Sequence, residues 1–534
     1  MGYASTPPGT VLLVLENETG SSRQQAVRLW PQPSSDPNDP LNWSTARKYF
    51  NFGIIAFYTL LVFALLDISP TLWQDQVEEL GVTYAQQNNT FAINCVGLAI
   101  GSVFLIPLAA KYGRRPVYIG SSIINLGMSI WLAKAETYTD LMISNLICGF
   151  TGSVSEVLVQ MTVEDIFFVH QRGLANSVYM LASNAGVFLA PVAAGFVAEA
   201  QGWRWAYWWC TIFIAINIVL FVFCYEETKF TVPTLAGATE ARTSIDAHTS
   251  SKDEKSGTNE RDDTFVTTLE IDSTIPRRSY RQRMAFFAPT HAPASLFLRH
   301  IWQPFVILAM FPAILYVAFT WGSQLAWFSM VNTTSAAYFP VPPYNFSTIG
   351  VGLLNLPAFI GATIASVYTA FVSDKSILWL AKRNNGVYEP EFRLYAAIFP
   401  ALASAVGVIL YGLSLAHGMP WIIPAVGIAI FGFGFVGLTH GVLTFLLDGY
   451  GDVAGDALVG VAFVRNMCAT AIVFAATPWI NELGMYDLFV CIGCLAFFFA
   501  GLTIPIIYFG KSLRVRGAAR YRDMAQSQYD ARAL

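Results

Sequence analysis

Long apolar runs that carry almost no charge dominate this sequence and most constrain what it can fold into. Only 12% of the 534 residues are Asp, Glu, Lys or Arg, about half the share found in soluble domains. A membrane-spanning helix needs about 20 apolar residues, and twelve runs approach or exceed that length: 49–69, 88–110, 117–134, 140–162, 174–198, 205–224, 301–328, 347–372, 393–415, 421–446, 457–480 and 485–509. The runs are continuous rather than alternating, which excludes an outer-membrane barrel. The chain is therefore predicted to be an all-α, multi-pass membrane protein and not a cytosolic enzyme.

A long polar segment divides these runs into two sets of six. Residues 225–300 are rich in Ser, Thr and charged residues and contain no run of membrane length, so this linker is predicted to be largely disordered. The expected fold has two pseudo-repeated six-helix bundles, 49–224 and 301–509. A polar tail precedes them at 1–48 and another follows at 510–534.

Lys and Arg are distributed unevenly between the two ends of the spans. If the N-terminus is cytoplasmic, the outer loops receive only Lys134 and Arg204. Positive charge gathers on the cytoplasmic side of membrane proteins, so both termini and the linker are predicted to be cytoplasmic. The Asn-X-Ser/Thr sequons at Asn88, Asn332 and Asn345 then face outward as candidate glycosylation sites, the last two in the most suitable outer loop.

Two sets of six spans joined by a linker are typical of duplicated transporters, whose substrate sites lie near the membrane midplane between the halves. Hydropathy alone is also compatible with a receptor or a membrane-embedded enzyme. However, the sequence contains no HExxH motif, no histidine cluster and no Gly-rich nucleotide loop. We therefore expect a transporter without enzymatic activity, metal or cofactor, which uses an ion gradient as its energy source and binds no nucleic acid.

A short cationic turn, Lys111-Tyr112-Gly113-Arg114-Arg115-Pro116, joins the second and third spans. Such a turn can hold helix ends against acidic partners, or can serve only as topogenic charge. The stretch resembles the signature loop of the major facilitator superfamily, Gly-x-x-x-Asp-Arg/Lys-x-Gly-Arg-Arg/Lys. It departs from that pattern at Ile106 and Ala110, where the family usually has Gly and Asp. The resemblance implies a gating loop whose members and partners are Lys111, Gly113, Arg114, Arg115, Asp165, Arg172 and, in the degenerate second copy, Asp374.

Small residues and a proline form a second pattern in the fifth span, Gly186-x-x-x-Ala190-Pro191-x-x-Ala194-Gly195. Small residues allow two helices to approach closely and proline permits a bend, which is also compatible with ordinary packing. The pattern resembles the helix-packing motif of exporters in the same superfamily. With Asp39-Pro40-x-Asn42-Trp43 and Gly202-Trp203-Arg204-Trp205, the chain resembles fungal twelve-span drug:proton antiporters, a group that includes polyamine and cation transporters. The resemblance implies proton-coupled antiport.

Proton coupling would need an ionisable group inside the membrane. Many proton-coupled members of the family have an arginine early in the fourth span, but this chain has Asn145 there. Ionisable residues are costly in lipid and are therefore functional candidates by default. Glu156, beside Gly152, Ser153 and Ser155, is the leading candidate to exchange a proton or to bind a cation; a structural hydrogen bond is the alternative. Asp67 is the second candidate, although near the outer end of its span it could also snorkel to the interface.

Other polar and aromatic residues complete the candidate site. Arg465, in the eleventh span, is expected to pair with Asp448 or Asp456, and His440 is expected to be a core histidine that could titrate near neutral pH. The plausible pocket residues are Trp321, Gln324, Trp327, Asn355, Tyr368 and Asn94. An apolar, aromatic cavity with few polar anchors suits an amphipathic organic compound.

The favoured function is proton-driven export of a small organic compound, such as a toxin, drug or secondary metabolite, across the plasma membrane, with a vacuolar or other internal membrane as an alternative. Proton-coupled uptake of a polyamine or other organic cation is the main alternative function, and a non-transporting nutrient sensor is a remote one. The expected partners are the substrate, protons and the lipid bilayer, and the expected state is a monomer.

Overall fold

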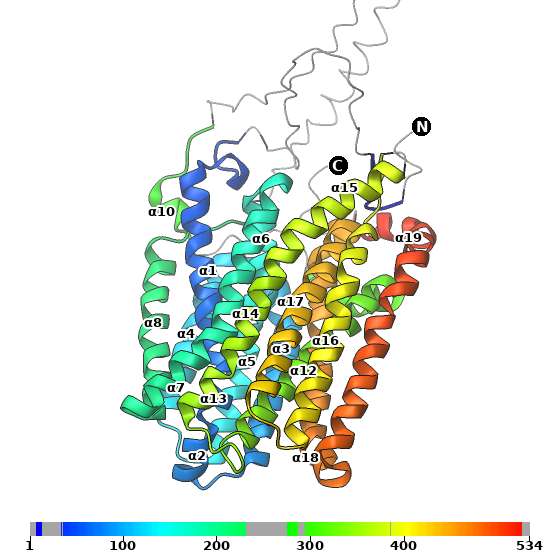
Figure 1. Cartoon of the computed structure of the whole chain (residues 1–534). Helices are drawn as coiled ribbons and strands as arrows, with labels where there is room; N and C mark the ends of the chain where they lie inside the picture. The colour runs from blue at the N-terminus through cyan, green and yellow to red at the C-terminus, as the bar shows by residue number, and fades with distance from the viewer. Residues whose placement is uncertain are drawn as a thin grey trace, which may run out of the picture.

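The computed structural model of the chain describes residues 7–12, 34, 36–230, 275–286, 294–384 and 386–525. Long helices lie side by side along one common direction (Figure 1). We call the end of the molecule at which the first long helix begins and the last one ends the terminal face, and the other end the opposite face. Most of the predicted linker, including residues 231–274, lies outside the described residues.

The first half of the structure contains six helical passes and a short amphipathic helix, α2 (Trp73–Leu80), between the first two passes. Its elements are η2 (Pro40–Asn42), α1 (Thr45–Asp67), η3 (Ser69–Leu72), α2 (Trp73–Leu80), α3 (Tyr84–Tyr112), α4 (Arg114–Ala133), α5 (Tyr138–Ile166), α6 (Val169–Asn184), the π-helical η4 (Ala185–Leu189), α7 (Ala190–Gln201) and α8 (Trp203–Phe223). Capping boxes begin α3 and α5, where Thr83 and Thr137 exchange hydrogen bonds with Gln86 and Asp140. These caps satisfy backbone N–H groups that a helix start leaves unpaired.

The second half repeats the arrangement. Its elements are α10 (Tyr280–Arg283), α11 (Ala294–Met310), α12 (Pro312–Tyr338), α13 (Thr348–Leu353), α14 (Asn355–Tyr368), the π-helical η5 (Thr369–Ser373), α15 (Asp374–Arg383), α16 (Phe392–Ala416), α17 (Ile422–Tyr450), η6 (Gly451–Val453), α18 (Ala454–Gly501) and α19 (Thr503–Ala525). A two-stranded antiparallel sheet pairs β1 (Val11–Leu12) with β2 (Val387–Tyr388).

Ten stretches of the described chain are long and apolar enough to cross a membrane. The last of these, 422–525, contains α17, α18 and α19 and supplies three passes. It reverses direction at η6 and again inside α18 at Gly484, whose φ of 77° lies in a region that glycine adopts readily. The prediction of an all-α protein with twelve transmembrane helices in two bundles is confirmed.

The helices extend beyond several predicted spans, and this changes the expectation for two glycosylation candidates. Asn332 lies inside α12 rather than in a loop and is buried. Asn88 is also buried, and its Nδ2 atom, which would carry a glycan, donates a hydrogen bond of 2.6 Å to the carbonyl of Val473. The prediction that these two sequons are accessible is therefore wrong, because the folded helices enclose them. Asn345 lies in the exposed loop between α12 and α13.

Candidate functional site

The central feature of the site is an ion pair that joins the two halves of the molecule. Glu156 of α5 accepts from the guanidinium of Arg465 on α18. Asn466, the next residue of α18, donates from Nδ2 to the other carboxylate oxygen of Glu156 at 2.9 Å. Glu156 and Arg465 are 9% and 8% exposed. Taking two such charges out of water is costly, so each of them depends on the other for compensation.

This arrangement corrects the partner that we expected for Arg465. Asp448 instead accepts hydrogen bonds from Tyr388 Oη at 2.6 Å and from Arg393. Asp456 pairs with His300, whose Nδ1 atom lies 3.0 Å from the carboxylate. Both proposed acids are therefore engaged within the second half, while Arg465 reaches across to the first.

Asp67 lies at the centre as well, but not as expected. It is the last residue of α1, shortly before η3 begins, and it is only 8% exposed. It does not snorkel to the surface. Leu66 packs against Gly152 of α5, since a Cβ built on that glycine would lie 3.0 Å from the leucine Cδ1 atom. This contact brings the end of α1, where Asp67 lies, against α5 four residues before Glu156.

Of the predicted pocket residues, Trp321 joins this centre most directly. The Arg465 guanidinium carbon lies 4.8 Å from the centre of the Trp321 ring, a cation–π contact. The hydroxyl groups of Ser153 and Ser155, which we expected to form a polar face with Glu156, instead donate to backbone carbonyls of their own helix. The centre therefore consists of Glu156, Asp67, Arg465, Asn466 and Trp321.

The other candidates are placed elsewhere or bond locally. Asn145 donates to the carbonyl of Leu141 in its own helix. Asn145 precedes Glu156 by eleven residues and therefore lies about 16 Å from it along α5. Gln324 accepts from Ser404 Oγ at 2.6 Å, and Tyr368 donates to the carbonyl of Ala396, both within the second half. His440 is half-buried on α17. Asn145, Gln324 and Tyr368 thus make these hydrogen bonds outside the central cluster.

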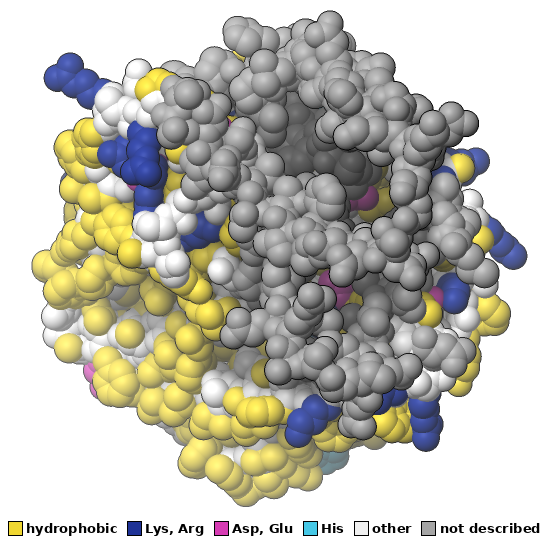
Figure 2. All heavy atoms as spheres, turned by 90° about the horizontal axis from the view of Figure 1, so that it is seen from above, with side chains coloured by type: hydrophobic (Ala, Val, Ile, Leu, Met, Phe, Trp, Pro, Cys, Tyr) yellow, Lys and Arg dark blue, Asp and Glu magenta, His cyan; other side chains and the backbone are white. Residues whose placement is uncertain are grey.

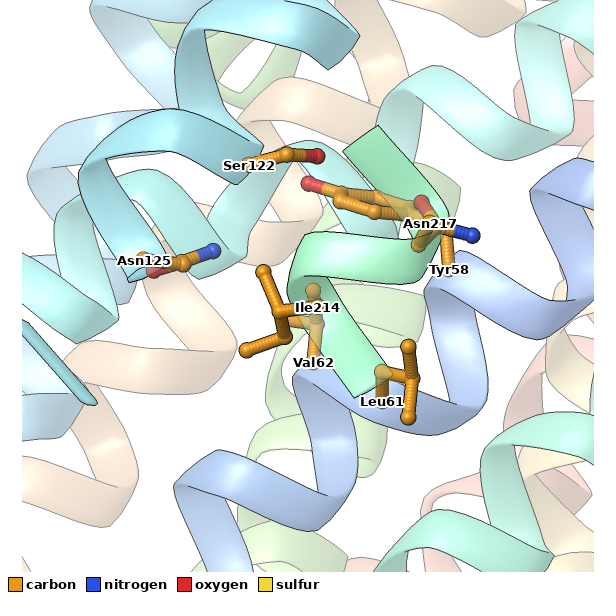
Figure 3. A pocket seen from close by; sticks show the side chains of 7 residues that line it. All are labelled: Tyr58, Leu61, Val62, Ser122, Asn125, Ile214 and Asn217. Carbon is orange, nitrogen blue, oxygen red and sulfur yellow. The ribbon is translucent and has the colours of Figure 1, made fainter. Parts of the chain in front are cut away.

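Two small cavities in the described part of the chain lie away from the ion pair, and neither Glu156 nor Arg465 lines them. One, of about 10 Å³ and roughly the size of a single water, lies inside the first half (Figure 3) and is lined by Tyr58, Leu61, Val62, Ser122, Asn125, Ile214 and Asn217. The other, of about 20 Å³, lies between α12, α13, α14 and α17, and Asn332 and Asn355 are among its lining residues. Their size and position do not suit an organic substrate that moves between the halves.

The cationic turn at the terminal face is held by an acid that we did not predict. Glu227, four residues after α8, accepts from the backbone N–H groups of Arg114 at 2.9 Å and Arg115 at 3.1 Å. These are the first residues of α4, where a helix has unpaired N–H groups and a partial positive charge. Gly113 has φ 114°, and a Cβ on it would lie 2.4 Å from a carboxylate oxygen of Glu227. Glu227 thus supplies a carboxylate to a loop that has Ala110 where the family usually has an acid. The sequence feature that could have indicated this acid is the Glu-Glu-Thr-Lys stretch directly after the sixth span.

The side chains of the turn connect three further segments. Arg114 pairs with Asp165 at the end of α5, with 3.2 Å between Nε and Oδ2. Arg172 donates to the carbonyls of Phe167 and Glu164. Arg115 donates to the carbonyl of Val222 at 2.7 Å and to those of Met284 and Ala285. The turn therefore joins α3, α4, α5, α8 and the segment before α11. The side chain of Asp374 lies outside the described residues.

The corresponding corner of the second half uses Arg514. Its guanidinium donates to Glu389 at 2.7 Å and to Glu391, both before α16. Burial alone would raise the pKa of Glu389, but Lys511, Arg514 and Thr10 hold that pKa below its usual value. Each half therefore has a buried cationic cluster at the terminal face.

The opposite face is closed by close packing between the halves. Gly195 and Gly352 bring α7 against α13: a Cβ on Gly195 would lie 2.9 Å from the carbonyl oxygen of Thr348, and one on Gly352 would lie 2.8 Å from that of Pro191. Thr348 also donates to Asp75 at 3.0 Å. Gly186, in the π-helical turn η4, packs instead against the backbone of α1 at Leu60. The small-residue motif thus places α7 against both its own half and the other half.

Comparison with known proteins agrees with this architecture. The sequence matches the profile of the Major Facilitator Superfamily over residues 52–476. The chain belongs to the major facilitator superfamily. It is a multi-pass membrane transporter and not an enzyme.

Its relatives include several fungal transporters of this superfamily. An uncharacterized MFS-type transporter of Schizosaccharomyces pombe is 31% identical over 97% of this chain and 94% of its own length. Protein HOL1 of Saccharomyces cerevisiae is 30% identical over 92% of this chain and 90% of its own length. Efflux pump radE of Floropilus chiversii is 23% identical over 86% of this chain and 78% of its own length. Among solved structures, the proton:xylose symporter XylE shares the fold with a TM-score of 0.59 at 12% identity, covering 87% of this chain and 97% of that chain.

Proposed function

We propose that this MFS transporter exports a small organic compound in exchange for protons, and that Glu156 is the residue that carries the proton. The observation behind the proposal is the buried ion pair between Glu156 and Arg465, because it lies between the two halves that must separate on one side during alternating access. We further propose that the terminal face is cytoplasmic, so that the contacts at the opposite face close the protein toward the outside.

In this mechanism, protonation of Glu156 removes the charge that holds Arg465. A neutral carboxyl attracts the guanidinium far less, so the contact between α5 and α18 weakens. The halves can then rock apart at one face and together at the other. Asp67, at the end of α1 where that helix packs against α5, acts as the alternate acid.

The charge of the centre favours neutral or cationic substrates. The centre contains two carboxyl groups, Glu156 and Asp67, but one guanidinium, that of Arg465, which pairs with Glu156, so the three groups sum to a negative charge when all are ionised. Trp321 adds an aromatic face that an amphipathic compound or a cation can contact. The same observation supports the second candidate function, proton-coupled uptake of a polyamine or other organic cation, in which the cation replaces Arg465 as the partner of Glu156.

Accumulation assays distinguish these two directions. Cells with and without the protein would be exposed to hydrophobic compounds and to a labelled polyamine, at external pH from about 5 to 8. Export predicts lower accumulation of hydrophobic compounds in cells that contain the transporter, most strongly at acidic external pH. Higher polyamine uptake at acidic pH would contradict export and support the second function.

The proposed orientation makes Asn345 the glycosylation site. In a secretory-pathway membrane, Asn345→Gln and Ser347→Ala should each remove a glycosidase-sensitive mobility shift, because both destroy the same exposed sequon. Asn332→Gln should leave the shift unchanged, since Asn332 is buried in α12. A shift that survives both sequon changes at 345–347 would contradict the proposed orientation of this loop.

A further inference from the structure

The short segment before α11 presents positive charge at the terminal face. Arg277, Arg278 and Arg281 are exposed within five residues of chain, in and just before α10. In the part of the chain that the structure describes, none of the three forms an ion pair. Arg283, by contrast, points inward and lies 3.7 Å from Glu226. The three arginines therefore present exposed positive charge in and just before α10.

The position of α10 relative to the bilayer follows from its contact with α8. Tyr280 donates from its hydroxyl to the carbonyl of Phe223, the last residue of α8, at 2.6 Å. Ile216, Val219 and Phe223 are exposed and form the apolar outer surface of α8. In Figure 1, α10 lies directly beyond the terminal end of α8, at the outer edge of the molecule. The arginines therefore lie where the lipid-facing apolar surface ends.

Seen from the terminal face, Lys and Arg side chains lie at several places along the edge of the molecule, including the side where α10 lies, and there they are next to apolar side chains (Figure 2). Tyr280 and Phe286 are 53% and 47% exposed in the same segment. Arginine beside exposed aromatic side chains at the end of a spanning helix is the chemistry of a membrane interface, where aromatic rings lie at the level of the headgroups. Basic residues next to a spanning helix attract anionic lipid of the cytoplasmic leaflet.

We propose that Arg277, Arg278 and Arg281 form a binding surface for the headgroups of anionic phospholipids. This surface is linked to the cationic turn, because Met284 and Ala285 of the same segment accept hydrogen bonds from Arg115. Lipid bound at α10 holds that segment against α8 and thereby steadies Arg115. The proposal rests on the proposed cytoplasmic orientation of the terminal face.

The test uses full-length protein purified in detergent, with fluorescent phosphatidylserine and phosphatidylcholine as probes, so its outcome does not depend on transport or on the substrate. The test variant is the triple change Arg277→Gln, Arg278→Gln and Arg281→Gln. The matched control removes the same charge from three exposed arginines of α19 by Arg516→Gln, Arg520→Gln and Arg522→Gln. A second control changes Arg277, Arg278 and Arg281 to Lys, which keeps the charge.

Each arginine near an anionic surface contributes about five-fold to binding at low salt. The glutamine triple should therefore lose at least about ten-fold in phosphatidylserine affinity, while the α19 control and the lysine triple change by less than about three-fold. Binding of wild type should weaken as salt rises. Unchanged phosphatidylserine affinity in the glutamine triple, an equal loss in the α19 control, or an equal loss of phosphatidylcholine binding would each overturn the proposal. A failed orientation would appear separately, as the wrong glycosylation pattern at Asn345.

Discussion

Arg465→Ala is expected to abolish transport and to lower the stability of the folded protein by about 3–5 kcal/mol. The reason is that Glu156 would remain buried as an uncompensated charge, with Asn466 as its described hydrogen-bond donor. The measurement is the thermal unfolding midpoint in detergent together with substrate flux in cells. Arg465→Lys keeps the charge but loses the geometry of the guanidinium, so it should retain more stability than the alanine variant.

The double variant Glu156→Gln with Arg465→Gln separates stability from function. Removing both charges together avoids an unpaired buried ion, so its unfolding midpoint should lie closer to wild type than that of Arg465→Ala. Proton-driven transport should stay abolished, because the acid that carries the proton is gone. If the double variant were as unstable as Arg465→Ala, the two residues would not compensate each other as the structure indicates.

Glu227→Ala is expected to have the second largest effect. It removes a carboxylate that accepts two N–H groups at the start of α4, and hydrogen bonds to charged groups contribute about 1.5–3 kcal/mol each when buried. Because Glu227 is half-buried, we expect a loss of about 2–3 kcal/mol in all and a fall of about ten-fold in transport rate. Unfolding midpoint and initial transport rate measure the two effects.

A second-site change tests whether Glu227 replaces the acid that the family loop usually has. Adding Ala110→Asp to Glu227→Ala places a carboxylate back in the turn and should recover part of the transport rate. Glu226→Ala is the matched control for loss of a neighbouring acid, since Glu226 pairs with Arg47 and Arg283 rather than with the turn. The proposal would be contradicted if Ala110→Asp failed to recover the transport rate and Glu226→Ala lowered that rate as much as Glu227→Ala does. The segment after α8 would then act only through its total negative charge, not through the contact of Glu227 with the turn.

The fold could be predicted because twelve apolar runs and one polar linker depend only on local composition. Glu156 could be predicted as a functional residue for a similar reason. A carboxyl group inside a membrane span is costly whichever helices surround it, so its position in the sequence is enough to mark it. The partner of Arg465 could not be predicted, because it depends on how α5 and α18 face each other across more than 300 residues of sequence separation. The nearest acids in sequence, Asp448 and Asp456, are instead bonded within the second half.

Loop and helix boundaries limited the remaining predictions. Asn332 was assigned to a loop because its polar sequence, Asn-Thr-Thr-Ser, lowers the hydropathy of that stretch, whereas α12 continues to Tyr338. The apolar run 49–69 ends just after Asp67, which predicts a position near the surface, whereas the folded chain leaves this residue only 8% exposed. Glu227 was overlooked because it belongs to the linker by composition, and its role arises only from the fold of the chain back onto α4.

The central claim is that Glu156 couples proton movement to transport, and one measurement tests it most directly. Wild-type and Glu156→Gln proteins in liposomes would be compared for proton-driven accumulation of the substrate and for substrate exchange without a proton gradient, from about pH 5 to 8. The account predicts that the glutamine variant loses proton-driven accumulation while it retains exchange with little dependence on pH, because glutamine resembles the protonated acid and can still contact Arg465 and Asn466. Accumulation and pH dependence equal to wild type in a correctly folded Glu156→Gln protein would contradict it.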